Sequence, residues 1–157
     1  MSEETKAGKT VRAAVFGLLC TGAGAIGGYY MTDRAAYKAG LEANYTVFTE
    51  QAGDVDLSLK VFADIARGKR VKTEEDLSQL QERLNKASTA ADNLARRLND
   101  HQIYKVFRQA GMDLKTASDK ATDPLNSRDL LVAVDQYKVA EEELRQRVIK
   151  QQRSLFF

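Results

Sequence analysis

Hydrophobic and polar residues follow a helical spacing along most of this chain, except in one early stretch that carries no charge. From Ala13 to Met31 the sequence reads AAVFGLLCTGAGAIGGYYM, without Asp, Glu, Lys or Arg. At 1.5 Å of rise per residue, a helix of this stretch is about 28 Å long, close to the ~30 Å hydrocarbon core of a bilayer. The pattern therefore predicts a transmembrane anchor over residues 13–31, preceded by a short cytoplasmic tail over residues 1–12.

Two other interpretations of the stretch exist. The glycines from Gly22 to Gly27 spell GxGxxG, the outline of a dinucleotide-binding turn, but no later segment resembles the parallel strands that such a turn needs. A cleaved signal peptide would use the small residues 23–25 as its cleavage site. The apolar run continues past that site, and Tyr29 and Tyr30 suit a membrane interface, which favours a retained anchor. Cleavage of the first part of the chain stays open as an alternative.

After the anchor, apolar residues recur at spacings of three and four, which predicts long helices that pack on one another with coiled-coil-like seams. The first stripe consists of Leu41, Tyr45, Phe48, Ala52, Val55, Leu59, Phe62 and Ala66. The second consists of Leu77, Leu80, Leu84, Ala87, Ala91, Leu94 and Leu98. The third stripe is out of phase with the second and consists of Ile103, Val106, Phe107, Ala110, Leu114, Ala117 and Ala121. The last consists of Leu130, Leu131, Val134, Tyr137, Ala140, Leu144 and Val148.

Local signals divide these stripes into elements. Gly68 suits a helix C-terminal cap, and Thr73 followed by Asp76 resembles a capping box at the start of the next helix. The change of phase predicts a bend or short loop within residues 99–102, and Pro124 ends the helix before it. The predicted fold is all-α: a single transmembrane helix, then an antiparallel bundle of three long helices over residues 32–157, or four if the bend is a true break.

Composition narrows the possible functions. The 157 residues contain 24 Lys and Arg against 22 Asp and Glu, so the formal net charge of +2 gives no support to nucleic-acid binding. Cys20 is the one cysteine, which leaves no disulfide framework and no cysteine-based metal site. His101 is the one histidine and fits a solvated residue at the bend. No catalytic residue, cofactor site or metal site is predicted, and we expect a non-enzymatic protein.

The anchor carries the clearest interaction signal, because small residues occupy one side of it. Small residues four positions apart let membrane helices approach closely. The predicted helix–helix interface consists of Cys20, Gly24 and Gly28, with Gly17 and Thr21 in a neighbouring row. Its expected partners are membrane lipid and either other membrane-protein subunits or a second copy of the chain.

Two further segments are candidate partner contacts. One is the basic turn, which consists of Arg67, Lys69, Arg70 and Lys72. The other is the apolar end of the chain at Phe156 and Phe157, which has the form of a C-terminal ligand for a peptide-binding domain. A solvated turn and a tail packed on the bundle are the structural alternatives.

Charge next to the anchor indicates its orientation. Lys6, Lys9 and Arg12 precede the anchor, whereas Arg34 and Lys38 follow it, which is a small bias toward a cytoplasmic N-terminus. We therefore expect a single-pass inner-membrane protein with its C-terminal domain in the periplasm. The expected function is that of an accessory, scaffold or assembly subunit of a cell-envelope membrane complex.

The layout of a short N-terminal anchor and a charged helical periplasmic domain is similar to that of the inner-membrane spanins of phages. That resemblance implies a lysis protein, but here the anchor starts a dozen residues in, and the chain folds back at Gly68 and Pro124. A different alternative is a ligand-sensing helical domain with a pocket between its helices. Tyr45, Tyr104 and Tyr137 could supply polar groups to such a pocket.

Overall fold

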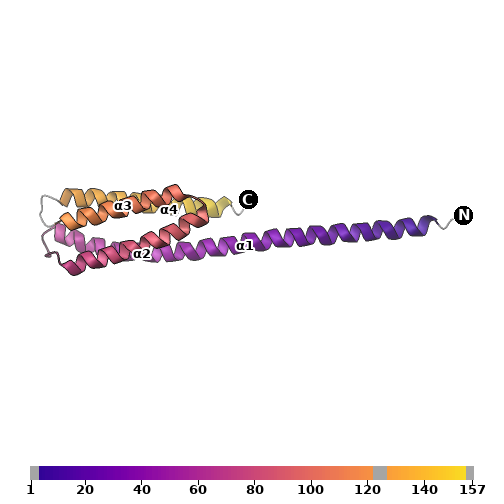
Figure 1. The fold of residues 1–157 in the computed structure, drawn as a ribbon, viewed down its shortest axis with the longest axis horizontal. Helices are drawn as coiled ribbons and strands as arrows, with labels where there is room; N and C mark the ends of the chain where they lie inside the picture. Colours follow the sequence, from indigo (N-terminus) through magenta and orange to yellow (C-terminus); the bar gives the residue numbers. More distant parts are fainter. Residues whose placement is uncertain (1–3, 122–126, 155–157) are drawn as a thin grey trace. The chain divides into compact units, whose positions relative to one another are not determined.

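The computed structural model of the chain describes the backbone of residues 4–121 and 127–154, and the side chains of residues 33–121 and 128–154. These residues form helices and no strand. The helices are α1 (Glu4–Ala66), α2 (Glu74–Leu98), α3 (His101–Lys120) and α4 (Ser127–Ser154), as Figure 1 shows. By its contacts the chain divides into two units, Met1–Ala39 and Gly40–Phe157. The prediction of an all-helical fold is confirmed, and the second unit is a bundle of four helices.

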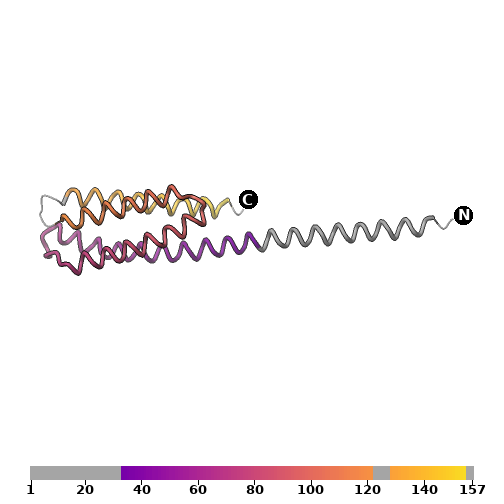
Figure 2. The backbone as a smooth tube through the Cα atoms, in the orientation of Figure 1, coloured from indigo at the N-terminus to yellow at the C-terminus, as the bar shows by residue number. Residues whose placement is uncertain are grey.

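Successive helices of the bundle run in alternating directions (Figure 2). α2 packs along α3 and α3 along α4, whereas α2 and α4 contact each other little. The part of α1 from Gly40 onward lies against α2, where Arg83 reaches Ser58, and against α4, where Lys138 reaches Asp56. α1 and α3 therefore occupy one diagonal of the bundle, and α2 and α4 the other.

Aromatic rings fill the centre of the bundle. The ring of Phe48 on α1 meets that of Phe107 on α3 edge-on, with the ring centres 5.5 Å apart. Tyr137 on α4 packs against Phe107 from the other side at 5.2 Å. All three side chains are buried. Such ring pairs add to the apolar burial that holds helices together, and they fix the height at which three helices meet.

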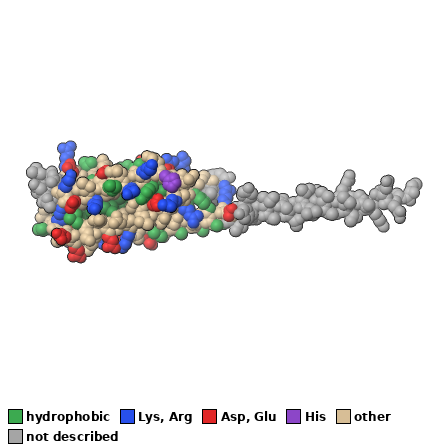
Figure 3. Space-filling model, in the orientation of Figure 1, with side chains coloured by type: hydrophobic (Ala, Val, Ile, Leu, Met, Phe, Trp, Pro, Cys, Tyr) green, Lys and Arg blue, Asp and Glu red, His purple; other side chains and the backbone are tan. Residues whose placement is uncertain are grey.

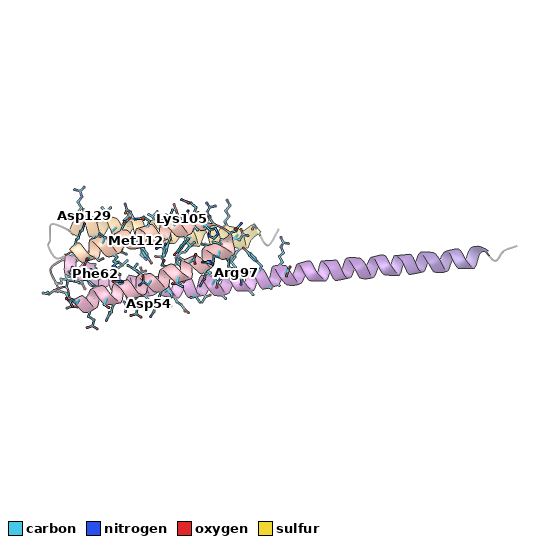
Figure 4. The ribbon with its side chains drawn as sticks, in the orientation of Figure 1. Asp54, Phe62, Arg97, Lys105, Met112 and Asp129 are labelled. Carbon is cyan, nitrogen blue, oxygen red and sulfur yellow. The ribbon has the colours of Figure 1, made fainter. Side chains whose placement is uncertain are left out.

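The first two predicted stripes match the core closely. Leu41, Phe48, Val55 and Phe62 of α1 are buried, and Phe62 lies near the turn that joins α1 to α2 (Figure 4). In α2 the buried residues include Leu80, Leu84, Ala87, Ala91 and Leu94, together with Ala90 and Ala95. The structure supports a helical bundle, and the coiled-coil interpretation of the seams stays a prediction.

The predicted stripe of α4 is partly wrong. Leu131 is 62% exposed and Val134 is only half-buried, whereas Leu130 and Ala133 are buried in their places. Glu141 is also buried, at a position that continues the spacing of Tyr137. The predicted face is therefore correct at Leu130, Tyr137, Ala140, Leu144 and Val148, and it also includes a small alanine and a paired glutamate that hydrophobicity alone does not assign to the core.

The turn between α1 and α2 has the predicted caps. Gly68 adopts φ +69°, and the amides of Gly68 and Lys69 donate to the carbonyls of Ile65 and Asp64. A left-handed residue at this place closes the last turn of a helix, and glycine adopts it without steric cost. The Thr73 hydroxyl accepts from the Asp76 amide. This reciprocal capping box starts α2.

The predicted bend within residues 99–102 is a true helix break. Asn99 adopts φ 53°, and the Asp100 amide donates to the Ala95 carbonyl, which ends α2. The Asp100 carboxylate then accepts from the Ile103 amide and caps α3. Asparagine tolerates the left-handed conformation better than most residues because its side chain can bond locally. The bundle therefore has four helices rather than three.

Candidate functional site

Several predicted contacts lie outside the residues whose side chains the structure describes. They are the helix–helix interface of Gly17, Cys20, Thr21, Gly24 and Gly28, and the tail residues Phe156 and Phe157. Pro124 also lies outside the residues that the structure describes. Among the residues whose side chains the structure describes, no helix is both long and apolar enough to cross a bilayer. The transmembrane anchor thus stays a prediction.

The basic turn is described in full, and much of it serves the fold. Arg70 pairs with Asp76 at 2.5 Å. The Lys72 ammonium donates to the carbonyls of Asp119 and Ser118 at 2.6 and 3.3 Å, in the last turn of α3. A cation there satisfies free carbonyls and complements the negative end of the helix dipole. Two of the four cations predicted to meet a partner are thus engaged inside the bundle.

The other two cations of the turn face solvent. Arg67 lies 3.8 Å from Asp64, and both side chains are more than half exposed. Lys69 is exposed as well. The turn therefore presents less free positive charge than the sequence indicates, and contact with an anionic partner stays a prediction for Arg67 and Lys69.

Asp76 is the anion that organises this turn. Its side chain is only 7% exposed. Burial raises the pKa of this carboxyl, but hydrogen bonds from Thr73 and the charge of Arg70 outweigh burial and hold the pKa below its ordinary value. The carboxylate therefore stays ionised at neutral pH and keeps both the helix cap and the Arg70 pair.

A second polar group of residues, missed in the sequence, lies between α1 and α4. We call it the ionic cluster, and it consists of Asp56 from α1 and Lys138, Glu141 and Arg145 from α4. The Glu141 side chain is 6% exposed and accepts from Lys138 at 2.9 Å and from Arg145 at 2.6 Å. Lys138 also forms an ion pair with Asp56, which joins the two helices. The guanidinium of Arg145 lies 5.9 Å from the centre of the Phe48 ring.

The charges of the ionic cluster stabilise one another. Burial raises the pKa of Glu141, but the bonds from Lys138 and Arg145 outweigh it and lower that pKa. Burial lowers the pKa of Lys138, but hydrogen bonds to Asp56 and Glu141 outweigh it and raise that pKa. Glu141 and Lys138 therefore stay charged at neutral pH. The cluster joins α4 to α1 through Lys138, which contacts both Glu141 and Asp56.

One signal could have revealed the cluster. The sequence already shows Glu141 and Arg145 four residues apart in the order that favours pairing. Glu141 also lies four residues after Tyr137 and three before Leu144, which is the spacing of the buried face. A glutamate on a core stripe with a cation one turn away indicates a buried ion pair rather than a solvated face.

Cations from α2 and α4 contact α1 at several positions along its length. Arg83 of α2 donates to the Asp54 carbonyl and to the Ser58 hydroxyl at 3.2 and 2.9 Å. Arg97 of α2 lies over Gly40, where an added Cβ would come within 2.9 Å of the guanidinium carbon. Asp54 and Arg97 are labelled on the bundle in Figure 4. The contact surface of α1 is therefore more polar than its apolar stripe indicates.

The surface of the described bundle has several hollows, four of which have the following volumes and lining residues. Two hollows of about 600 and 640 Å³ follow the groove between α3 and α4, where Val106 and Val139 are exposed. A third of about 430 Å³ lies between α1 and α2. The fourth, of about 520 Å³, lies between α2 and α3 and is lined from α4 by Tyr137. On the face that Figure 3 shows, charged side chains are interspersed with hydrophobic ones over the bundle.

The tyrosines and the histidine take different places. Tyr137 is fully buried, whereas Tyr45 and Tyr104 are half-buried, and no described hollow brings the three together. His101 is exposed at the first position of α3, as predicted for a solvated residue at the bend. Among the described residues, no group of three or more His, Cys, Asp or Glu side chains is placed to hold a metal ion.

Comparison with known proteins returns no relative: no family model, no curated protein and no solved structure matches the chain.

Proposed function

We propose that this protein is a non-enzymatic, membrane-tethered subunit that serves in the assembly or support of a cell-envelope complex. The observation that carries the proposal is the uncharged stretch from Ala13 to Met31, followed by a charged helical bundle. A stretch of that length and composition suits a single membrane crossing. The bundle then stands on the extracytoplasmic side, with the N-terminus in the cytoplasm.

The polar groups of the bundle support a structural role. Asp76 caps α2, Lys138 joins α4 to α1, and Lys72 closes the end of α3. Glu141 holds Lys138 and Arg145 within α4. A catalytic acid or base needs a proton-exchanging group at an accessible place with a matched partner. These side chains instead fix the packing of the bundle, as expected of a domain whose task is to present surfaces to other proteins.

Topology is the first test of this proposal. A reporter that is active only outside the cytoplasm, fused after Phe157 in a bacterial host, should be active, and the same reporter fused before Ser2 should be inactive. The reverse result would overturn the orientation. Sequencing the N-terminus of the mature protein completes the test, because a start near Ile26 would mean that the stretch is a cleaved signal and not an anchor.

Association through the anchor is the second test. Replacing Gly24 and Gly28 with Ile adds bulk to the small-residue side while the stretch stays fully apolar, so insertion should survive. Crosslinking through Cys20 in native membranes should decrease, because two backbones can no longer come close. The matched control replaces Leu18 and Leu19 with Ile, which keeps the small-residue side intact. Equal crosslinking in both variants would make the stretch a plain tether.

A further inference from the structure

A continuous groove follows the junction of α3 and α4, which pack side by side (Figure 1). Its two hollows, of about 600 and 640 Å³, share Gln102 and Val106 of α3 and Val139 and Glu143 of α4, so they form one surface. On α3 the groove extends from Gln102 to Asp113. At 1.5 Å of rise per residue this is about 17 Å, or about three turns of a helix.

Valines form the exposed apolar part of this groove. Val106 is 41% exposed and Val139 is 54% exposed, and the buried side chains Ile103 and Ala110 also line the groove. Val132 is 50% exposed and lies seven residues before Val139, on the same side of α4. Solvated positions of a helix usually carry polar residues, and valine is a poorer helix former than glutamate or lysine. Three exposed valines along one groove therefore favour contact with a further apolar surface.

Carboxylates outnumber cations around the groove, although the whole chain has a formal net charge of +2. The carboxylates that line it are Asp100, Asp113, Asp135, Glu142 and Glu143, and the cations are Lys105, Arg147 and Lys150. One of these cations, Arg147, pairs with Asp100 at 3.5 Å, at the end of the groove where α3 begins. The acidic excess therefore lies along the rest of the groove and favours a partner that carries positive charge.

Two of these carboxylates lie on either side of the exposed valine of α4. Asp135 and Glu143 are four residues before and after Val139, on the side of α4 that lines the groove. They are about 12 Å apart along the helix axis. Both side chains are exposed, and neither forms an ion pair or a hydrogen bond with a residue that the structure describes. This arrangement matches a helix that has an apolar residue over Val139 and a cation about one turn to either side of it.

We propose that the α3–α4 groove binds a basic amphipathic helix of a partner protein. The apolar side of that helix packs on Val106 and Val139, and its Lys or Arg side chains face Asp135 and Glu143. Helices that dock in grooves present apolar residues at spacings of three and four. A second copy of the chain is a poorer occupant, because two grooves with the same acidic excess would face each other. This site goes beyond the role in assembly and does not depend on it, because every residue that forms it belongs to the bundle.

Fluorescence anisotropy of a labelled peptide with the full chain in a non-ionic detergent tests the site, and protein-free micelles give the baseline. The probe is an alanine-based helical peptide of about four turns. It has a leucine stripe at spacings of three and four, and a lysine about one turn before and after its central leucine. We expect saturable binding of one peptide per chain, and weaker binding at higher salt. The same peptide with glutamate in place of lysine should bind at least about tenfold more weakly, because it meets charges of its own sign.

Two matched valine variants locate the apolar contact. Val139→Gln should weaken binding of the lysine peptide at least about fivefold, because it places a polar group at the centre of the contact. Val47→Gln changes a valine of α1 that is 49% exposed, close to the exposure of Val139, and should bind as the wild type does. Both side chains face solvent, so both variants should fold.

Two matched pairs of carboxylates test the charge. Replacing Asp135 with Asn and Glu143 with Gln should weaken binding of the lysine peptide about three- to tenfold, and the remaining binding should depend less on salt. The control replaces Glu50 with Gln and Asp54 with Asn, which removes two exposed carboxylates from α1. It lowers the net negative charge of the bundle by the same amount and should leave binding unchanged.

Several results would overturn the proposal. Absence of saturable binding to the wild type, with the peptide found only in micelles, would remove the docking site. Equal binding to Val139→Gln and to Val47→Gln would place the peptide elsewhere on the bundle, and equal binding of the lysine and glutamate peptides would overturn the basic partner. A wild-type dimer in analytical ultracentrifugation that Val139→Gln dissociates and Val47→Gln does not would make a second copy the occupant. None of the peptide results bears on topology or on association through the anchor, so the two proposals fail separately.

Discussion

Glu141 and Tyr137, two buried polar side chains of α4, differ in how their hydrogen bonds are satisfied. Glu141 has two cations bonded to its carboxylate, and one of them, Lys138, continues to Asp56 on α1. Tyr137 lies on the same helix one turn earlier, and its hydroxyl has no described partner. A satisfied buried group stabilises the fold, whereas an unsatisfied one costs free energy.

Removing a cation from the ionic cluster should have the largest effect on the free energy of unfolding. Arg145→Met keeps the length and the apolar stem of the side chain but deletes two hydrogen bonds to Glu141. Because Glu141 is buried, losing one of its two cations should reduce the free energy of unfolding by about 2–3 kcal/mol. Urea unfolding followed by circular dichroism measures it.

The control for that variant is Lys86→Met, which removes an exposed pair with Glu82 on α2. Exposed pairs contribute little, so the unfolding midpoint should stay close to that of the wild type. If the two variants lost equal stability, the ionic cluster would contribute no more to the free energy of unfolding than an exposed ion pair does.

Acid should weaken the same contacts. The folded-state pKa values of Glu141 and Asp76 are lowered, so the folded state takes up protons less readily than the unfolded one. Their contribution is complete above the ordinary pKa, 4.5 for a glutamate, and is lost as the pH falls through the folded-state values. The urea midpoint should be flat from neutral pH to about 5 and fall below that.

The variant Glu141→Gln isolates the glutamate in this profile. It should be less stable than the wild type at neutral pH, and its midpoint should fall less steeply in acid. A wild-type midpoint that rises as the pH drops below 4.5 would contradict the lowered pKa values.

A smaller change in stability, in the opposite direction, is expected at the hollow between α2 and α3. Gly111→Ala replaces the glycine inside α3 with the best helix former, and its Cβ would make one ordinary contact with Leu84. The free energy of unfolding should rise by about 0.5–1 kcal/mol. Gly53→Ala in the open part of α1 is the reference and should gain a similar amount. A loss of stability at Gly111 alone would mean that the helices need that space to pack.

The smallest effect is expected for Tyr137→Phe. The hydroxyl makes no described hydrogen bond, so its removal should change the free energy of unfolding by less than about 0.5 kcal/mol, or raise it. Thermal unfolding of the unliganded chain measures the change. A loss as large as that of Arg145→Met would show that the hydroxyl has a structural partner, and the contrast between the two side chains would disappear.

Local signals in the sequence were sufficient for the ends of the helices. Gly68, Thr73 and Asp76 form the predicted turn because each residue there acts within one helical turn of its neighbours. The phase change after Leu98 also revealed the junction of α2 and α3. That the junction is a full break depended on the left-handed conformation of Asn99, which asparagine permits but does not require.

Contacts between helices were harder to predict. Leu131 is exposed and Ala133 is buried because the face of α4 is set by what α1 and α3 present, not by the size of its own residues. The pairing of Lys138 with Asp56 links residues far apart in the chain, and nothing in their spacing reveals it. The hollow between α2 and α3 was not predicted, because Gly111 and Leu84 come together only in the folded bundle.

The most direct test of the contrast is a double-mutant cycle between Asp56 and Lys138, the ion pair that joins α1 to α4. Unfolding free energies of Asp56→Asn, Lys138→Met, the double variant and the wild type give the coupling between the two side chains. Because both side chains are partly exposed, we predict a favourable coupling of about 1 kcal/mol. A coupling of zero would mean that the ionic cluster does not hold α1, and the assignment of these polar groups to the fold would be wrong.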